Sequence, residues 1–557
     1  MSNKGRQIGP LDFRRSTDQY RHWRMDIEAG IARVTLDVAP GGGLSDDYEL
    51  KLNSYDLSVD VELYDMTQRL RFEHPEVGAV VLTGGPERVF CAGANIQMLA
   101  GSTHEHKVNF CKFTNETRLG IEDATDVSHQ TWIAAVNGTA AGGGYELALA
   151  CAEIILVDDR SSAVSLPELP LLAVLPGTGG LSRVIDKRQV RRDLADVFAT
   201  RAEGVKGEQA LAWGLVDVLA APSIFEETVR TRALEAAARS DRPGGPGVTL
   251  HPLSRLVDGP FISYSSLKIE LDRNLSVAHF RILGPAYEEP SCATLLLETG
   301  DSAWILRLCR ELDDAVLHLR FNEPGIGTWV FHSSGDPSAV VAVEDTLDND
   351  SEHWLVREIR AYWKRTFKRL DTSARTLITL VEPGSCFVGT LAELVLAADR
   401  SLILEDSLGE GAQPSPSLVL TAANHTQFPM GNGLTRLQAR YWGHDDELRA
   451  VVELTGRPLA GKECASLGLV TFAFDELDWD DEVRMTLEER STFSPDALTG
   501  MEANLSFVGP ETMESKIFGR LSTWQNWIFL RPNASGSDGA LRRYGTGSRP
   551  IYDRKRV

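Results

Sequence analysis

Long hydrophobic runs are missing from this 557-residue chain. No stretch of about 18 apolar residues is present, so we expect no membrane-spanning helix. The first seven residues are polar and lack the apolar core of a secretory leader. Basic charge is also scarce, because 57 Lys and Arg face 79 Asp and Glu and give a net charge of −22. A chain this acidic is not expected to bind nucleic acid or an anionic membrane over a broad surface.

Cysteine motifs and several catalytic motifs are missing as well. The seven cysteines are spread along the chain without a C-x-x-C pair, which argues against a disulfide framework and a metal site and favours the reducing cytoplasm. No G-x-x-x-x-G-K-[ST] or G-x-S-x-G occurs, and the glycines at 142–144 do not fit G-x-G-x-x-G. These absences argue against a P-loop, a serine hydrolase and a dinucleotide-binding turn.

Short apolar runs alternate with helical patterns in the first half of the chain. We expect strands at 31–36, 79–83, 131–136 and 153–157, and helices at 57–74 and about 144–152. Strands that are almost wholly apolar and are separated by helices are typical of a parallel sheet covered on both faces. The sequence therefore predicts an α/β fold, preceded by a loose polar lead-in over residues 1–22.

The chain also repeats itself at a spacing of about 250 residues. The run ELALA at 146–150 returns as ELVLA at 393–397, and GLSR at 180–183 returns as GLTR at 433–436. Proline and glycine concentrate between the two copies, at 239–247. We therefore expect a tandem duplication: a first unit at 1–240, a linker at 241–260, and a second unit at 261–557 that ends in a helical, basic tail.

The segment from Gly142 to Glu146 carries the clearest chemical signal. A strand stops at three glycines and a helix begins there. The first N–H groups of a helix have no internal partner and carry partial positive charge, and glycine lets a ligand approach that backbone closely. Such a place can hold a developing oxyanion. A tight turn that needs glycine only for packing is the alternative interpretation of this segment taken alone.

Three segments together resemble the crotonase (enoyl-CoA hydratase/isomerase) superfamily. FCAGANI at 90–96 is similar to the family's F-x-A-G-A-D-I, and AVNGTAAGGGYELA at 135–148 is similar to A-V-x-G-x-x-x-G-G-G-x-E-L-A. PELPLLAVLPGTGG at 167–180 is similar to P-E-x-x-x-G-x-x-P-G-x-G-G. The resemblance covers about 25–230. It implies a crotonase-like fold that acts on an acyl-CoA thioester, with no cofactor apart from the coenzyme A of the substrate.

The resemblance also assigns roles to individual residues. It places the two N–H donors of a thioester oxyanion hole at Ala94 and Gly143, and two catalytic carboxylates at Glu146 and Glu168. It implies that coenzyme A and the acyl group contact Asn95, Ile96, Gln97, Gly142 and Cys111. The loop at 94–97 reads ANIQ where the family has A-D-I-K, so a coenzyme site that needed the lysine would need another cation.

The second copy departs from this pattern. Residues 142–146 correspond to GTLAE at 389–393, and Glu168 corresponds to Thr421. We therefore expect the second copy to be degenerate and to lack a site of its own. Because family units usually assemble through apolar faces, we also expect an oligomer, in the form of a homodimer.

The length, the missing dehydrogenase half and the tail WQNWIFLRPN at 524–533 resemble a ring-opening branch of the superfamily. That resemblance implies hydrolysis of an aromatic acyl-CoA epoxide. Two alternatives are kept: a generic enoyl-CoA hydratase or isomerase with an added domain, and a non-catalytic protein that binds CoA esters.

Overall fold

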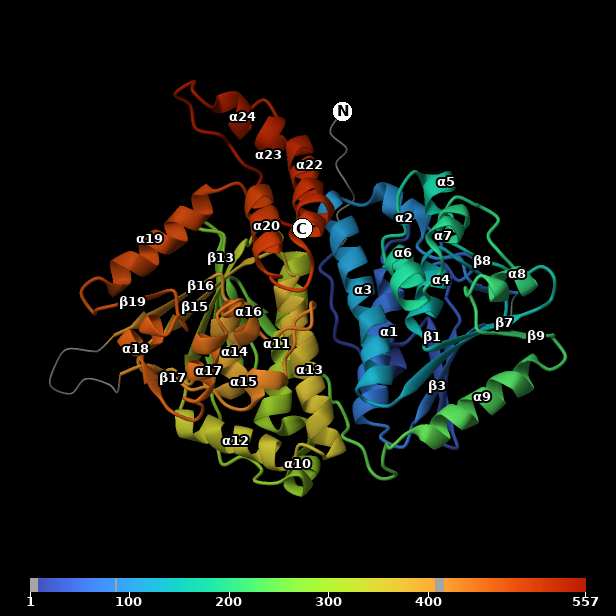
Figure 1. The fold of residues 1–557 in the computed structure, drawn as a ribbon, viewed down its shortest axis with the longest axis horizontal. Helices are drawn as coiled ribbons and strands as arrows, with labels where there is room; N and C mark the ends of the chain where they lie inside the picture. Colours follow the sequence, from blue (N-terminus) through green and yellow to red (C-terminus); the bar gives the residue numbers. More distant parts are fainter. Residues whose placement is uncertain (1–8, 86–87, 406–414) are drawn as a thin grey trace. The chain divides into compact units, whose positions relative to one another are not determined.

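The computed structural model describes residues 9–85, 88–405 and 415–557 (Figure 1). It divides the chain into two compact parts, which we call unit 1 (Met1–Pro252) and unit 2 (Leu253–Val557). The boundary between them falls inside the expected linker at 241–260. Among the described residues, no helix combines the length and the apolar character needed to cross a membrane.

Unit 1 is built on a six-stranded sheet in the order β1-β2-β3-β5-β7-β9. Only β1 and β2 pair antiparallel, and each later pair is parallel. The strands are β1 (Trp23–Glu28), β2 (Ile31–Leu36), β3 (Ala79–Gly84), β5 (Thr131–Val136), β7 (Glu153–Val157) and β9 (Val218–Ala220). The predicted strands at 31–36, 131–136 and 153–157 are confirmed, and the one at 79–83 extends by one residue. The α/β class follows directly from this order.

Helices cover both faces of this sheet. On one face, the apolar residues of α9, including Phe225, Val229 and Ala233, join the strand residues in a single core. The other helices of unit 1 that bear on the argument are α1 (Leu57–Phe72), α2 (Ile96–Gly101), α3 (His104–Asp126), α4 (Gly143–Ala150), α5 (Glu168–Leu172), α6 (Gly180–Ser182), α7 (Arg192–Ala199), α8 (Gly207–Ala212) and α9 (Phe225–Arg239). Helices α1 and α3 pack side by side (Figure 1), and α3 also packs on β5. The two predicted helices are confirmed as α1 and α4.

A buried ion pair joins α1 to α3. Arg118 and Asp60 are both almost fully buried, and an N–H of the Arg118 guanidinium donates to Asp60 Oδ1. The hydroxyl of Thr114 donates to the other oxygen of Asp60 at 2.7 Å. With both carboxylate oxygens occupied, the charges are paired rather than left bare in the interior.

The prediction of a loose lead-in is wrong for the described residues 9–22. Phe13 is buried, and its ring lies 5.1 Å from that of Phe113 on α3. The lead-in looked loose because its one buried aromatic has no neighbouring apolar residues in the sequence. Its partner lies about a hundred residues further along, and no local periodicity reports such a contact.

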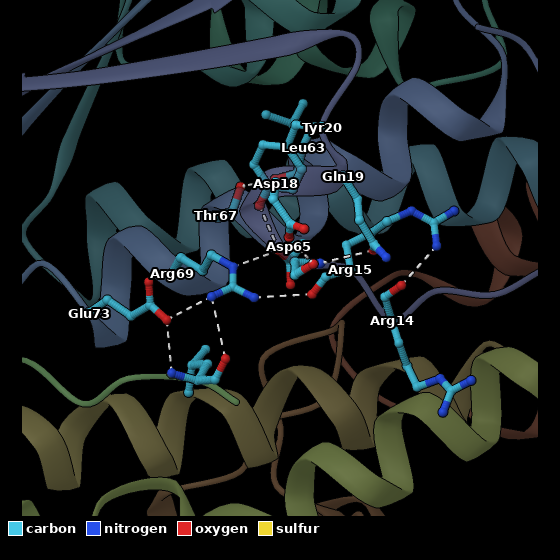
Figure 2. A network of polar contacts seen from close by, with 12 residues as sticks. Arg14, Arg15, Asp18, Gln19, Tyr20, Leu63, Asp65, Thr67, Arg69 and Glu73 are labelled. Carbon is cyan, nitrogen blue, oxygen red and sulfur yellow. Dashed lines mark hydrogen bonds and ion pairs between the residues drawn. The ribbon is translucent and has the colours of Figure 1, made fainter. Parts of the chain in front are cut away.

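Arg69 of α1 ties three distant segments of unit 1 together (Figure 2). Its guanidinium donates to Asp65 at 2.7 Å and to Glu73 at 2.8 Å. It also donates to the carbonyl oxygens of Arg15, in the lead-in, and of Leu250, just before the unit boundary. One side chain thus holds the beginning and the end of unit 1 against the same helix.

The first part of the expected linker is therefore not a free tether. The N–H of Val248 donates to the carbonyl of Phe72 at 2.7 Å, and that of Leu250 donates to Glu73 Oε1 at 2.8 Å. Val248 and Leu250 are both buried. The proline and glycine content marks a segment without regular structure, but this segment packs along the end of α1.

Unit 2 contains an eight-stranded sheet in the order β10-β11-β12-β13-β14-β15-β16-β19. Its strands are β10 (Leu256–Asp258), β11 (Phe261–Ser263), β12 (Leu267–Asp272), β13 (Val277–Leu283), β14 (Thr328–Ser334), β15 (Thr376–Val381), β16 (Arg400–Leu404) and β19 (Phe472–Phe474). From β12 onward, one antiparallel pair is followed by four parallel pairs. This is the same sequence of pairings as in unit 1.

The helices of unit 2 also follow the plan of unit 1. Trp479 and Leu487 of α19 pack on alternate strand residues, as α9 does in unit 1. The helices are α10 (Ala293–Thr299), α11 (Trp304–Asn322), α12 (Pro337–Asn349), α13 (Trp354–Asp371), α14 (Ala392–Ala397), α15 (Ala423–Thr426), α16 (Arg436–Arg440), α17 (Asp445–Val452), α18 (Gly461–Ser466) and α19 (Trp479–Thr492), followed in the tail by α20 (Pro495–Leu505), α21 (Met513–Lys516), α22 (Ser522–Leu530), α23 (Pro532–Ser535) and α24 (Ala540–Arg543).

The Arg69 network yields a stability prediction. Arg69→Leu should lower the free energy of unfolding by about 3 kcal/mol, because two partly buried carboxylates lose their cation. It should also make the lead-in and residues 247–252 more sensitive to limited proteolysis. The matched control is Arg24→Leu, because the Arg24 side chain is 72% exposed in its pair with Asp37 and should matter little. Equal effects of the two substitutions in chemical denaturation would contradict this role for Arg69.

Candidate active site

A small second sheet in unit 1 gathers the predicted site residues. It consists of β4 (Val89–Cys91), β6 (Thr139–Ala141) and β8 (Val164–Ser165), in the order β4-β6-β8 with both pairs parallel. Because the strands are parallel, their carboxyl ends lie at the same edge. The chain leaving these ends carries Ala94, Gly143 and Glu168. Residues more than 70 positions apart are therefore brought together by a few backbone pairs.

Ala94 lies in a loop beside Gly143, where α4 begins. A Cβ placed on Gly93, just before Ala94, would lie 2.8 Å from the nitrogen of Gly143. Gly143 is the first residue of α4, so its N–H has no partner within the helix. Within residues 9–85, 88–405 and 415–557, neither this N–H nor that of Ala94 donates to an acceptor. Two unused donors beside each other are what binding of a carbonyl oxygen requires.

Gly142 makes the turn into α4 possible. Its φ is +54°, in the region that favours glycine, and its N–H donates to the carbonyl of Ser165 at 2.9 Å. A Cβ at this position would lie 2.6 Å from Oε1 of Glu168. Any side chain at 142 would thus displace the carboxylate that follows β8.

Glu146 is held by the turn that precedes and begins α6. The side chain is 2% exposed. Its Oε1 accepts from the N–H of Thr178 at 3.0 Å and from the N–H of Gly180 at 2.7 Å, while the Thr178 hydroxyl donates to Oε2. Three hydrogen bonds from one turn fix the orientation of this carboxylate toward residues 178–180.

Glu168 has a different environment. It is the first residue of α5, and its Oε2 is buried without a hydrogen-bond partner among the described residues. Burial, reinforced by the negative charge of Glu146, raises the pKa of Glu168 to about 7. Near neutral pH this carboxyl group is therefore divided between its acid and its anion. Two nearby carboxylates in unlike environments are the usual arrangement for an acid and a base that work together.

Cys111, on α3, also borders this site. A Cβ on Gly177 would lie 3.1 Å from its sulfur, in the turn that holds Glu146. Burial, together with the charge of Glu146, raises the pKa of the thiol to about 11. The thiol is thus protonated at neutral pH, and its place is that of a lining group rather than a ready thiolate.

The predicted coenzyme loop borders a surface cavity of about 460 Å³. The side chain of Asn95 is not free to reach into it, because it accepts from the N–H of Met98 as the cap of α2 and donates to the carbonyl of Glu49. Ile96 and Gln97 are exposed. The lining residues are Asp46, Asp47, Tyr48, Glu49, Lys51, Ser54, Ala92, Ala94, Asn95, Ile96 and Gln97. Lys51 supplies a cation here, although it is paired with Glu49 at 3.0 Å.

Two residues that touch this site were not found from the sequence. Thr178 stands within the P-G-T-G-G run, so a signal existed, but its two bonds to Glu146 depend on the fold. Tyr55 stands in no motif. Its hydroxyl lies against Gly143, where an added Cβ would be 2.0 Å from it. Nothing in the local sequence around Tyr55 indicates this contact.

The turn at Gly389 in unit 2 has a backbone similar to that at Gly142 but different neighbours. Gly389 has a φ of +51° and donates to the carbonyl of Val419 at 2.9 Å, as Gly142 does to Ser165. The next N–H, of Thr390, is however occupied: it donates to Oε1 of Glu344 at 2.8 Å. Glu344 comes from α12 and is 1% exposed. The carboxylate of Glu344 is thus the acceptor for the N–H that corresponds to the N–H of Gly143 in unit 1.

The carboxylate of Glu393 in unit 2 is paired with a cation. Glu393, which occupies the place of Glu146 in the repeat, is fully buried. Its oxygens accept from Asn424 at 2.8 Å and from the guanidinium of Arg436 at 3.0 Å. Thr421, in place of Glu168, adds no second carboxylate. The pair between Glu393 and Arg436 suits a structural role, and not the role of a catalytic base for Glu393.

Comparison with known proteins agrees with the motifs. Residues 47–242 match the family model for enoyl-CoA hydratase/isomerase. Over 234 residues the chain is 30% identical to a fatty acid oxidation complex subunit alpha of Shewanella loihica, which covers 42% of this chain and 30% of that protein. A solved enoyl-CoA hydratase of Bacillus anthracis is 28% identical, with a TM-score of 0.33, covering 39% of this chain and 77% of that one.

A full-length relative extends the likeness to both units. The chain is 50% identical over 548 residues, or 98% of each protein, to the benzoyl-CoA-dihydrodiol lyase of Aromatoleum evansii. The likeness thus includes unit 2 and the tail, which the family model does not reach. The chain is therefore an enzyme of the crotonase (enoyl-CoA hydratase/isomerase) superfamily and belongs to the family of the benzoyl-CoA-dihydrodiol lyase.

Proposed function

We propose that this enzyme opens the ring of 2,3-epoxybenzoyl-CoA with two waters and releases a dehydroadipyl-CoA semialdehyde and formate, in aerobic benzoate degradation. One observation carries the proposal: two carboxylates in unlike environments lie beside a pair of unused N–H donors in unit 1. The full-length likeness to a benzoyl-CoA-dihydrodiol lyase supports an aromatic acyl-CoA as the substrate.

Each group has a role in this reaction. The N–H groups of Ala94 and Gly143 bind the thioester oxygen and stabilise the negative charge that develops on it. Glu146, which three hydrogen bonds hold in place, takes a proton from an attacking water. Glu168, in its acid form, gives a proton to the epoxide oxygen as the carbon–oxygen bond breaks. The bond between ring carbons 2 and 3 of the resulting diol then breaks and leaves an aldehyde at each carbon. The second water adds to the aldehyde at carbon 2, the bond from carbon 2 to carbon 1 breaks, carbon 1 takes up a proton, and carbon 2 leaves as formate.

The cavity at 94–97 suits the adenine end of coenzyme A. Three carboxylates line it, from Asp46, Asp47 and Glu49, and they would repel phosphate groups at close range. A neutral base that contacts the backbone of this loop meets no such repulsion. We propose no further cofactor, since coenzyme A arrives as part of the substrate, and we propose a cytoplasmic location, where acyl-CoA thioesters are formed and used.

We also infer that units 1 and 2 arose by duplication and that unit 2 has lost its site. The repeated order of strand pairings and the matching turns at Gly142 and Gly389 support a common origin. Glu344 on the N–H of Thr390 and Arg436 on Glu393 support the loss. In this view unit 2 contributes structure, and catalysis belongs to unit 1.

The test of the reaction is product analysis. Purified enzyme is incubated with 2,3-epoxybenzoyl-CoA in H₂¹⁸O, and the products are examined by mass spectrometry. Formate and a C6 acyl-CoA that carries label are the expected products. Turnover of crotonyl-CoA without any reaction of the epoxide would instead favour a generic hydratase, and binding of both without turnover would favour a non-catalytic role.

Substitution of the two carboxylates separates catalysis from folding. Glu146→Gln and Glu168→Gln should each lower kcat about 10²–10⁴-fold, because a positioned acid or base is lost. The matched control is Glu393→Gln in unit 2, which should lower Tm by weakening the pair with Arg436 and leave kcat near that of the wild type. Near-normal rates in both unit 1 variants, or equal loss in the control, would contradict the assigned roles.

The pH dependence of kcat tests the assignment of Glu168 as the acid. Because its pKa is about 7, the acid form disappears as the pH rises through neutrality, and kcat should fall by about tenfold per pH unit well above that value. Removing the neighbouring charge with Glu146→Gln should lower this pKa, so that the residual rate falls at a lower pH. A kcat that rises through pH 7 would show that Glu168 acts as the anion.

We propose a homodimer on the strength of the tail. Exposed apolar residues gather on α21, α22, α24 and their connections, among them Phe518, 73% exposed, and Leu530, 78% exposed. Patches of this kind usually serve association. Light scattering should give a molar mass of about twice the 61.2 kDa of one chain for the wild type. Phe518→Glu combined with Leu530→Glu should give monomers, whereas Leu477→Glu, at an 84% exposed position outside the tail, should not. A monomeric wild type would overturn this proposal.

A further inference from the structure

Tyr55 is attached by its backbone to the loop that carries Ala94. Its N–H donates to the carbonyl of Gly93 at 2.9 Å, and its carbonyl accepts from the N–H of Asn95 at 2.8 Å. These two bonds form a parallel bridge between Tyr55 and Ala94, just before α1 begins. The position of the tyrosine is therefore fixed relative to one of the two N–H donors.

The hydroxyl of Tyr55 reaches the other donor. A Cβ on Gly143 would lie 2.0 Å from Oη of Tyr55, so the hydroxyl sits against the first residue of α4. The whole side chain is 2% exposed. Its oxygen has no hydrogen-bond partner among the residues that the structure describes. A buried polar group in this condition is unusual and needs a reason.

The ring of Tyr55 is held in place from behind. The guanidinium of Arg118 lies 5.3 Å from the ring centroid, and the ring of Phe110 lies 6.0 Å away. Arg118 is in turn anchored by its buried pair with Asp60. Burial raises the pKa of the Tyr55 hydroxyl well above its usual value, so it keeps its proton and is a donor, not a base.

Packing alone does not account for this residue. A phenylalanine would fill the same space and interact with Arg118 in the same way, without burying a hydroxyl that has nothing to bind. Two other buried tyrosines do have acceptors for their hydroxyls. Tyr145 donates to the carbonyl of Leu215 at 2.7 Å, and Tyr264 donates to Asp314 at 2.7 Å. The Tyr55 hydroxyl is thus a donor that lies beside Ala94 and Gly143 and has no acceptor among the described residues.

We propose that the Tyr55 hydroxyl is a third hydrogen-bond donor to the thioester carbonyl oxygen of the substrate, together with the N–H groups of Ala94 and Gly143. The proposal rests on the acyl-CoA chemistry of the proposed function. The hydroxyl keeps its proton throughout and donates only a hydrogen bond, which strengthens as charge moves onto the oxygen. A third donor suits this thioester, because the ring double bonds that remain in the epoxide are conjugated with the carbonyl and place extra electron density on its oxygen.

The kinetic experiment uses Tyr55→Phe in the full chain. Removing one such donor should lower kcat by about 10²-fold. Since the hydroxyl has no partner among the described residues, Tm should be unchanged or higher. The matched control is Tyr264→Phe, which removes a buried, paired hydroxyl in unit 2 and should lower Tm with kcat unchanged. A wild-type kcat in Tyr55→Phe, or a lowered Tm that accounts for the loss of activity, would overturn the proposal.

A spectroscopic experiment reads the bond without any turnover. Benzoyl-CoA labelled with ¹³C at the thioester carbonyl lacks the epoxide and binds as an unreactive probe. Its carbonyl stretch in the infrared difference spectrum should lie at a lower frequency on wild-type enzyme and on Tyr264→Phe than on Tyr55→Phe. Equal frequencies on all three would overturn the role of Tyr55. If the wild type fails to open the epoxide but the frequencies differ, the proposed reaction is wrong and the hydrogen bond from Tyr55 stands.

Discussion

The buried carboxylate of Glu146 is the constraint on which the rest of the site depends. Its three hydrogen bonds fasten the start of α4 to the turn at 178–180, so the helix whose first N–H faces the site cannot move independently of that turn. Its charge then acts on its surroundings, adding to the effect of burial in raising the pKa of Glu168. One carboxylate thus bears on both the geometry of a donor and the pKa of the neighbouring Glu168.

A comparison of the turns at Gly142 and Gly389 shows which features of this region come from the backbone and which come from side chains. Gly142 and Gly389 make the same turn with the same hydrogen bond to the following strand. In unit 1 the next N–H has no acceptor within the part of the chain that the structure describes, whereas in unit 2 it donates to the carboxylate of Glu344. A donor that is satisfied within the protein gains nothing from a substrate oxygen. The fold alone therefore does not make a site, and the difference lies in which donors are left unpaired.

Sequence reasoning succeeded for the strands whose signal is local. The strands at 131–136 and 153–157 are continuous apolar runs, and such runs mark buried parallel strands directly. The motifs predicted that Ala94, Gly143, Glu146 and Glu168 share a site; the parallel strands β4, β6 and β8 bring their segments close together, and the roles of these residues stay predictions. What failed was long-range: the lead-in with Phe13 and the packed segment at 247–252 depend on partners that lie far away in the sequence.

Tyr55 shows why the remaining part of a site escapes such reasoning. In the sequence it is one aromatic residue ahead of a helix, and packing would explain it fully. Its proposed role rests on three observations that only the folded structure provides. These are the bridge to Ala94, the contact with Gly143 and the absence of a partner for its hydroxyl among the described residues. Glu168 is similar, since its raised pKa arises from burial and from a charge that the chain places beside it. Among the described residues, neither Oη of Tyr55 nor Oε2 of Glu168 has a hydrogen-bond partner. In the proposed reaction, an acyl group with oxygens at the thioester and on the ring offers an acceptor for the hydroxyl and a partner for the carboxylic acid.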